Sequence, residues 1–551
     1  MRQILVLAGI LGGGWPVLAQ TAPPPATPPT FSDTLVVSAS LGSEERDAVP
    51  ATATVIDDKE IAARQVAILS DLIATVPGVN ISQAGGAGQQ TSLFLRGSNS
   101  NQTLLLWNGI PLNDPYFGGA NWQFVPLDGV ARVEVVRGPF SALYGTDAVG
   151  GVIQVLTGTR QGGSFDLEGG SHGYGRGGVA AGTDLGPVRL DLTGHLRRGD
   201  GDVANERFDS GEAVVRALWS LTPGVGLGLM ARGNDSKTGV PFSSGLPTPN
   251  SEISWREREI AVPFRADQSD WSLDAQLSRT TFDSTFRNPD DPFGFTKSDT
   301  DSEAQRGRAV VSYQVGHGLT LAGGGDWERL KVDNSSSFGT NLDGARQRTW
   351  AAFGQASYGM GPVHLEVGVR RDDNDVYGSH TSLRTGAVVQ LAQGTRLRAS
   401  YGEAFRAPSL GELFFPFSGN PDLKPETVRS WEVGIEQEVR GAGGNWRFSL
   451  TGFENRRRTL IDFTPVTFVD VNVGRARSRG AEGQVAFDRG GYSARLNGTY
   501  LEALDLETGL ALLRRPRHGA NLQLIARPGE WTLSATGRFV GERADLDPAT
   551  F

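Results

Sequence analysis

The segment Val130-Ala131-Arg132-Val133-Glu134-Val135-Val136-Arg137-Gly138-Pro139 alternates apolar and charged residues, which is typical of a strand. A glycine-rich bend from Tyr144-Gly145 to Gly150-Gly151 follows it and leads into a second strand-like run, Val152-Ile153-Gln154-Val155-Leu156. Loops this rich in glycine are unusual in an ordinary core. The two runs and the bend therefore predict a small, compact globular unit.

Two apolar runs upstream belong to the same unit. The first is Leu93-Phe94-Leu95-Arg96-Gly97, and the second, Leu104-Leu105-Leu106-Trp107, follows a polar tip. The pair Asn108-Gly109 then predicts a tight turn, because asparagine and glycine tolerate a positive φ.

Helical spacing precedes these strands, at 61–64 and again at 68–76, where Ser70 or Asp71 could cap the helix and Pro77-Gly78 ends it. Short helices against a few strands make a small α+β domain. The stretch 80–91 is mostly glycine, alanine, glutamine and serine, so we expect a loop. With Asn99 and 113–118 it would form a surface that faces the outside.

From about residue 160 the pattern changes to long amphipathic strands. Five stretches alternate apolar and polar residues: 188–196, 363–370, 397–401, 492–500 and 531–539. Strands that are apolar on only one face have too little apolar surface for a sandwich core of this size. They suit a barrel with lipid outside and water or a plug inside. If each strand and its connection take about 20 residues, the length of the segment 160–551 predicts about 19 strands.

Aromatic residues expected near strand ends fit the girdles at membrane interfaces, namely Trp350, Phe353, Trp431, Trp446 and Trp531. A β-propeller would also supply many strands. It would leave the first 150 residues and the amphipathic alternation without a role.

The composition excludes several classes of protein. A formal charge of -9 excludes nucleic acid as a partner, and the lack of cysteine excludes disulfide scaffolds and cysteine-ligated metals. Beyond the first nineteen residues, no apolar run approaches the roughly 18 that a spanning helix needs. No HExxH, GxSxG or Walker motif is present, so we expect no enzyme. The stretch 169–175 imitates a phosphate loop, but we expect a turn there.

The N-terminus indicates export. Arg2, an apolar run and small residues before Gln20 predict a signal peptide at 1–19. The proline-rich stretch 20–32 predicts an extended tether.

An isolated strand-forming segment follows the tether, namely Asp33-Thr34-Leu35-Val36-Val37-Ser38-Ala39. Such a segment suits addition to the edge of a partner's sheet. The alternative is that it forms the first strand of the globular unit.

These motifs resemble those of the TonB-dependent outer-membrane receptors. The resemblance rests on 95–97, 107–113, 133–139 and 144–153, and on a barrel signature that starts at 401–413 and continues through 419–426 to 431–432. It implies a plug threaded into a 22-stranded barrel in the outer membrane of a diderm bacterium. It also implies active transport of a scarce ligand, TonB as partner, a TonB box at 33–40 and, as we expect, a monomer surrounded by lipid. The plug would span 41–159 and the barrel 160–551.

Within the family the chain resembles the cobalamin receptors most, through 371–374, 419–421, 455–462 and 512–515. This implies cobalamin uptake, with ferric siderophore uptake as the alternative. By position, the ligand would contact Gln90, Ser92, Asn99, Phe117, Gly118 and Arg514. Gln90 and Phe117 depart from the aliphatic types expected there.

The same resemblance implies a structural calcium ion in an early extracellular loop. Asp200, Asp202, Asp209 and Asp235 could supply the hard oxygen ligands, although Asn250 replaces an expected aspartate. The alternative is that these are solvated loop acids.

Three further expectations concern the plug charges, the chain end and rival functions. Arg96, Arg132 and Arg137, with Glu134, should pair with acids of the barrel wall, because buried charges need partners. The stretch 541–551 reads as a loop, so we expect a truncated chain whose barrel has two unpaired edges. The rivals are a passive porin whose plug is only a stopper and a soluble periplasmic carbohydrate enzyme.

Overall fold

A computed structural model describes the protein at residues 35–36, 40–41, 44–45, 48–243, 246–464 and 468–545. The predicted signal peptide and tether lie outside these residues, as does the predicted TonB box except for Leu35, Val36 and Ser40. Leu35 and Val36 form β1 (Leu35–Val36), which pairs with β2 (Glu44–Glu45) in a ladder of two residues.

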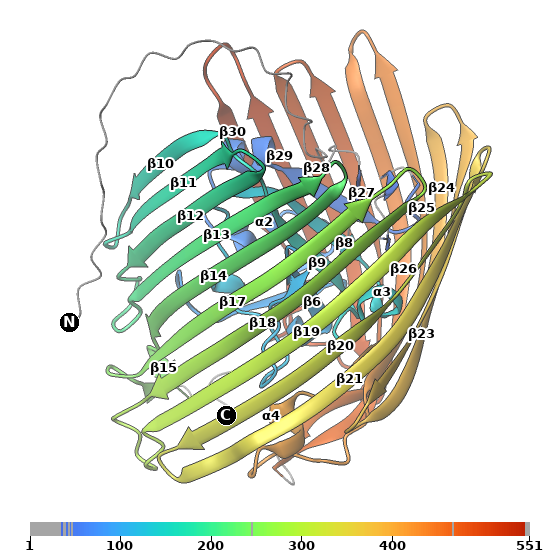
Figure 1. The fold of residues 1–551 in the computed structure, drawn as a ribbon. Helices are drawn as coiled ribbons and strands as arrows, with labels where there is room; N and C mark the ends of the chain where they lie inside the picture. Colours follow the sequence, from blue (N-terminus) through green and yellow to red (C-terminus); the bar gives the residue numbers. More distant parts are fainter. Residues whose placement is uncertain are drawn as a thin grey trace. The chain divides into compact units, whose positions relative to one another are not determined.

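Nineteen antiparallel strands form one sheet, which we call the wall, in the order of the sequence (Figure 1). The wall strands are β10 (Gly162–Gly169), β11 (Gly175–Leu185), β12 (Val188–Gly199), β13 (Phe208–Thr222), β14 (Val225–Gly239), β17 (Glu252–Asp267), β18 (Trp271–Arg287), β19 (Lys297–Gly316), β20 (Leu319–Ser336), β21 (Gly339–Met360), β22 (Val363–Asn374), β23 (Gly378–Ala392), β24 (Thr395–Arg406), β25 (Glu426–Gly441), β26 (Gly444–Thr464), β27 (Val469–Arg489), β28 (Tyr492–Asp505), β29 (His518–Ala526) and β30 (Leu533–Val540). The predicted number of about 19 strands is confirmed. In this order β10 and β30 each have one neighbour among the described residues, and the predicted truncation stays a prediction.

The wall strands are apolar outside and polar inside. In β22, Leu365, Val367 and Val369 are each more than two-fifths exposed, whereas the alternating residues Arg370 and Asp372 are buried. The hydrophobic effect would place these side chains the other way round in a water-soluble sandwich. The pattern is that of a barrel with lipid around it.

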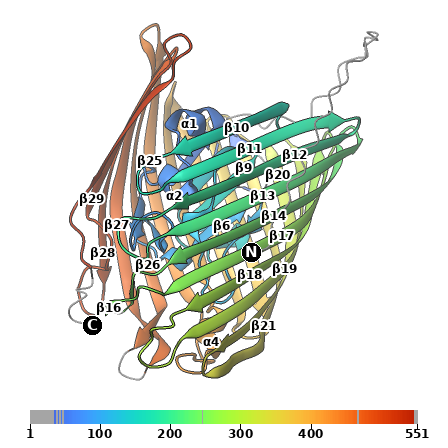
Figure 2. The ribbon, with the colours of Figure 1, turned by 90° about the vertical axis from the view of Figure 1, so that its left-hand side faces the viewer.

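The two ends of the wall differ. At one end the connections are long and carry a short helix, α4 (Leu410–Phe414), and a hairpin, β15 (Phe242–Ser243) with β16 (Leu246–Pro247) (Figures 1 and 2). At the other end the turns are short, such as His317-Gly318 between β19 and β20. We call these the loop end and the turn end. The sequence patterns do not predict the helix α4.

Residues 48–157 form a plug, which lies against the inner face of the wall (Figures 1 and 2). Its sheet has the order β3 (Ala53–Asp57), β8 (Val130–Arg137), β9 (Gly151–Thr157), β6 (Thr103–Trp107) and β7 (Ile110–Pro111). Its other elements are β4 (Val79–Gln83), β5 (Thr91–Leu95), α1 (Asp58–Arg64), α2 (Leu69–Ile73), α3 (Ser141–Tyr144), and the 3-10 turns η1 (Ser100–Gln102) and η2 (Trp122–Phe124). Two apolar clusters, around Leu105 and around Val136, form its core.

Local sequence predicted most plug elements, with two corrections. Asn108 and Gly109 both have positive φ, as expected of their turn. The cap assigned to Ser70 or Asp71 is wrong, because α2 starts after Ile68 and the carbonyl of Val125 accepts from the first helical amide at 2.8 Å. The stretch 80–91 is not all loop, since residues 80–83 belong to β4 and Thr91 begins β5, with which β4 pairs.

One predicted girdle residue points the other way. Phe353 is buried on the inner face, where its ring lies 4.7 Å from the guanidinium carbon of Arg308. Trp350, three residues earlier on β21, has the opposite parity and is exposed. Trp531 lies outside any strand. In the described part of the chain, no helix is long and apolar enough to cross a membrane.

Candidate functional site

Buried ion pairs join the plug to the wall. Arg96 donates to Glu482 through Nε at 2.8 Å and Nη2 at 2.9 Å, and its Nη1 donates to Glu432. Arg137 donates to the same Glu482 at 3.1 Å. Burial alone would lower the pKa of Arg96, but the two carboxylates outweigh it and raise that pKa. We call these four residues the plug lock.

The expected pairing with the wall is confirmed for Arg96 and Arg137. Arg132 pairs at 2.8 Å with Glu134, two residues along the same strand. The strand β8 lies between β3 and β9 within the plug sheet, so Arg132 has its partner within the plug.

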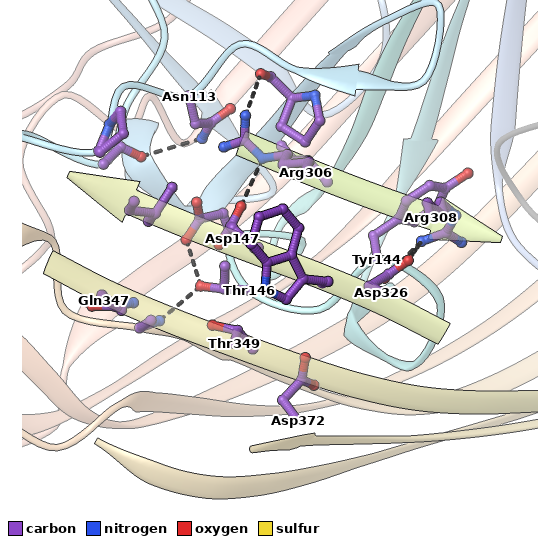
Figure 3. Close-up of a pocket in the computed structure, with 18 of the residues that line it drawn as sticks. Asn113, Tyr144, Thr146, Asp147, Arg306, Arg308, Asp326, Gln347, Thr349 and Asp372 are labelled. Carbon is purple, nitrogen blue, oxygen red and sulfur yellow. Dashed lines mark hydrogen bonds and ion pairs between the residues drawn. The ribbon is translucent and has the colours of Figure 1, made fainter. Parts of the chain in front are cut away.

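A cavity of about 130 Å³ lies between the plug and the wall strands β18 to β22 (Figure 3). Its wall side carries three guanidinium groups, each held by a carboxylate. Arg306 pairs with Glu328 at 2.7 Å, Arg308 pairs with Asp326 at 2.9 Å, and Arg370 pairs with Asp372 at 2.8 Å and also with Asp326. The positive charge of each of these three arginines is therefore balanced by carboxylates of the wall itself.

The plug side of the cavity carries two carboxylic acids, Asp114 and Asp147. Burial raises the pKa of each to about 7. Asp114 accepts from the amide of Tyr116 at 2.7 Å and from the hydroxyl of Ser302 at 3.1 Å. Neither acid has an arginine close enough to form an ion pair within the described residues. Each acid can therefore take up a proton near neutral pH.

The loop-end surface of the plug, which we call the apex, comprises 84–90, 99–102 and 113–121. It touches two wall segments. The amides of Leu410 and Gly411 donate to the carbonyls of Pro115 and Tyr116, both at 3.0 Å. Asn80 donates to the carbonyl of Arg514 at 2.8 Å. The plug therefore contacts the loops 407–425 and 506–517, and we call the region where these loops meet the apex the vestibule.

The structure brings together some of the six predicted ligand residues. Gly118 lies beside Asn101, which follows Asn99 by two residues, so these two predicted positions are near each other. Phe117 is two-fifths exposed at the apex. Ser92 lies within β5, and Gln90 is exposed at the tip of the β4–β5 hairpin.

Arg514 itself faces Asp545, with which it pairs at 2.8 Å. The side chain that reaches the plug is that of the next residue, Arg515. It donates to Oδ1 of Asn99, and its guanidinium carbon lies 4.1 Å from the centre of the Phe94 ring. Contact of Arg514 with a ligand stays a prediction.

A second arginine stands close to Arg515. Arg457 on β26 is buried and donates to the hydroxyl of Ser478 at 2.7 Å. Glu426, whose charge acts on Arg457, is engaged by Arg406, Gln102 and the amide of Ile461. Neither Arg457 nor Arg515 has an ion pair within the described chain, and the Nε of each lacks a hydrogen-bond partner. Burial and the neighbouring Arg457 and Arg514 lower the pKa of Arg515 to about 9.

Aromatic rings line the vestibule beside Phe117. Tyr116 and Phe415 meet edge to face with ring centres 6.5 Å apart, and Phe415 meets Phe417 at 5.7 Å. Phe417 is nearly two-thirds exposed. The vestibule therefore places accessible aromatic surface near two arginines that have no ion pair among the described residues.

The four aspartates predicted to hold calcium do not form a ligand set. Asp209 pairs with Arg207 at 3.1 Å, and Asp235 pairs with Arg256 and Arg258. Asp202 lies 3.5 Å from His172, and Asp200 is exposed in the loop after β12. Among the described residues no group of three or more acids or histidines could hold a metal ion. Calcium binding stays a prediction, which calorimetric titration of wild type and D209A tests.

Two family profiles match this chain. The profile "TonB-dependent Receptor Plug Domain" matches residues 45–152, and the profile "TonB dependent receptor-like, beta-barrel" matches residues 197–551, which is more than half of the chain. The chain belongs to the TonB-dependent receptor family. Members of this family are transporters and receptors, and their barrel fold implies the outer membrane of a Gram-negative bacterium.

Solved structures resemble this TonB-dependent receptor over most of its length. A ferric enterobactin receptor mutant from Pseudomonas aeruginosa is 22% identical, with a TM-score of 0.75 over 88% of this chain and 85% of that chain. A siderophore receptor from Acinetobacter baumannii is 18% identical, with a TM-score of 0.72 over 89% and 87%. A copper transporter is 18% identical, with a TM-score of 0.76 over 90% and 87%. At these identities the likeness concerns the fold.

Proposed function

We propose that this receptor takes up an anionic, aromatic ferric siderophore through TonB-dependent transport across the outer membrane, as a monomer. The observation that carries the proposal is the pair Arg457 and Arg515 at the base of the vestibule. A buried or half-buried cation without an ion pair is costly, so two of them together favour a ligand that brings negative charge.

The chemistry of ferric chelates meets this requirement. Fe³⁺ prefers deprotonated oxygen donors, and chelators that supply more than three such charges give an anionic complex. Aromatic donor rings would pack on Phe117 and Phe417 or stack on the guanidinium plane of Arg515. The solved structures described above include receptors named for ferric enterobactin and for siderophores. They support this ligand class over cobalamin, which the sequence resemblance favoured.

Energy coupling would start at the TonB box. Leu35 and Val36 pair with only two residues of β2, and a ladder this short contributes little stability. TonB could replace β2 as the partner strand at small cost, because the backbone hydrogen bonds would be exchanged one for one. Tension on this segment would then act on the plug, which the plug lock fastens to the wall.

Binding to the purified receptor tests the ligand class. We expect a ferric tris-catecholate to bind, and the double variant R457Q/R515Q to bind it at least tenfold more weakly, since hydrogen bonds to charged groups are worth about 1.5–3 kcal/mol each. The matched control is R514Q, because Arg514 is already paired with Asp545. Tight binding of cyanocobalamin, with no binding of the ferric chelate, would refute the proposal.

A further inference from the structure

Six arginines gather on the outward face of β25, β26 and β27 near the loop end. We call them the arginine patch: Arg429, Arg456, Arg458, Arg475, Arg477 and Arg479. The residues that alternate with them, such as Asn455 and Ser478, are buried on the inner face. The patch therefore faces away from the plug and the vestibule.

The strand register sets like charges opposite one another in this patch. Arg456 has Arg429 as its cross-strand partner on one side and Arg477 on the other, and Arg458 has Arg475. Like charges directly opposite destabilise a sheet. Since neighbouring strands lie about 4.8 Å apart, the row of three spans about 10 Å.

The carboxylates nearby are too few to compensate the patch. Glu403 pairs with Arg429 at 3.1 Å, Glu454 pairs with Arg456, and Glu502 serves both Arg477 and Arg479 at 3.1 Å. No ion pair involves Arg458 or Arg475 within the described residues. Six cations thus face three carboxylates, in a chain whose formal charge is -9.

The patch borders the apolar outer surface. On the same face, the strands continue toward the turn end with exposed Trp431, Val433, Ile435 and Leu450. The ring of Trp431 lies 5.3 Å from the guanidinium carbon of Arg456. An aromatic ring between an apolar band and a cationic rim is typical of the interface between acyl chains and head groups.

We infer that the arginine patch binds the phosphate groups of a phosphorylated lipid in the outer leaflet. Guanidinium groups bind phosphate through paired N–H donors. The acyl chains of such a lipid would lie on the apolar band directly below, so its phosphates would stand at the height of the patch. The inference rests on the membrane location of the wall and does not depend on the transported ligand.

Lipid binding to the purified full-length receptor in neutral detergent tests the inference. The probes are a diphosphorylated lipid A, the same lipid without phosphates, and inorganic phosphate. The test variant is R456Q/R477Q. The control is R256Q/R279Q, which removes two outward arginines of β17 and β18 that are already paired with Asp235 and Glu303.

At about 1 kcal/mol for each arginine near the lipid head groups, the patch variant should bind the phosphorylated lipid about 30-fold more weakly. The control should change binding less than threefold, and the dephosphorylated lipid should bind weakly to all forms. Equal binding of the phosphorylated lipid by patch variant and control would overturn the inference. Binding of inorganic phosphate as tight as that of the lipid would also overturn it, since the site would then be one for a free anion. An unfolding midpoint in denaturant equal to that of wild type shows that the patch variant is folded.

Discussion

Arg96 of the plug and Glu482 of the wall meet in a two-pronged ion pair, and both side chains are almost completely buried. They are 386 residues apart in the sequence. Arg137 shares the same carboxylate. The removal of this one carboxylate would therefore leave two buried guanidinium groups short of a partner.

We expect E482Q to destabilise the attachment of the plug by about 3–5 kcal/mol, because breaking a buried ion pair leaves uncompensated charge. Hydrogen exchange at the amides of β5 measures this as faster opening. The control is E502Q on the outward face, where each exposed pair is worth about 0–1 kcal/mol. Unchanged exchange in E482Q would show that the plug lock contributes nothing to plug attachment.

The TonB box prediction is tested by L35P. Proline removes a backbone donor and disfavours a straight strand, so uptake should be abolished while ligand binding to whole cells stays intact. A26P, in the proline-rich tether, is the matched control and should transport normally. Normal uptake in L35P would refute the coupling role of this segment.

The buried carboxylic acid Asp114 predicts a pH dependence. Its pKa is raised by burial from 3.8 to about 7, so the folded plug binds more protons than the unfolded chain between these pH values. The stability contributed by the neutral acid is therefore complete below about pH 4 and is lost as pH rises to about 7. D114N should flatten this slope, which urea unfolding at several pH values measures. D200N, at an exposed loop position, should leave the slope as in wild type.

Gly151 predicts a steric effect. A Cβ there would stand 2.2 Å from the carbonyl oxygen of Val136, at a φ of +153°. G151A should therefore cost about 3 kcal/mol or more and shift the paired strands. Gly138 also has a positive φ, but a Cβ there would meet nothing within 4 Å, so G138A should cost only about 1 kcal/mol. Equal costs in denaturant unfolding would contradict this account.

Local pattern was enough to predict the strands and their number. The alternation of apolar and polar residues in 363–370 predicts which face of the strand is apolar. The pair Asn108-Gly109 predicts the turn that the two residues form. Strand alternation places Phe353 on the opposite face from Trp350, because the two residues are three apart, but it does not say which of the two faces the lipid. The register of β21 with β22 decides this, since Phe353 lies opposite the buried Arg370. That register was not available from one sequence.

The candidate site depended on contacts between distant segments. Arg515 and Asn99 are 416 residues apart, and Arg457 gains its importance only because Glu426 is already engaged elsewhere. The sequence signal was present as the runs Arg456-Arg457-Arg458 and Arg514-Arg515. Which arginine of each run faces inward follows from strand parity and loop conformation, and these are set by the folded wall.

The most direct test of the central claim is uptake of radioactive iron, supplied as an anionic ferric tris-catecholate, by receptor-deleted cells that express this protein with and without TonB. The account predicts uptake only when TonB is present, its loss in L35P, and its reduction at low chelate concentration in R457Q/R515Q. Equal entry of the chelate with and without TonB would contradict the account, because the protein would then be a passive pore.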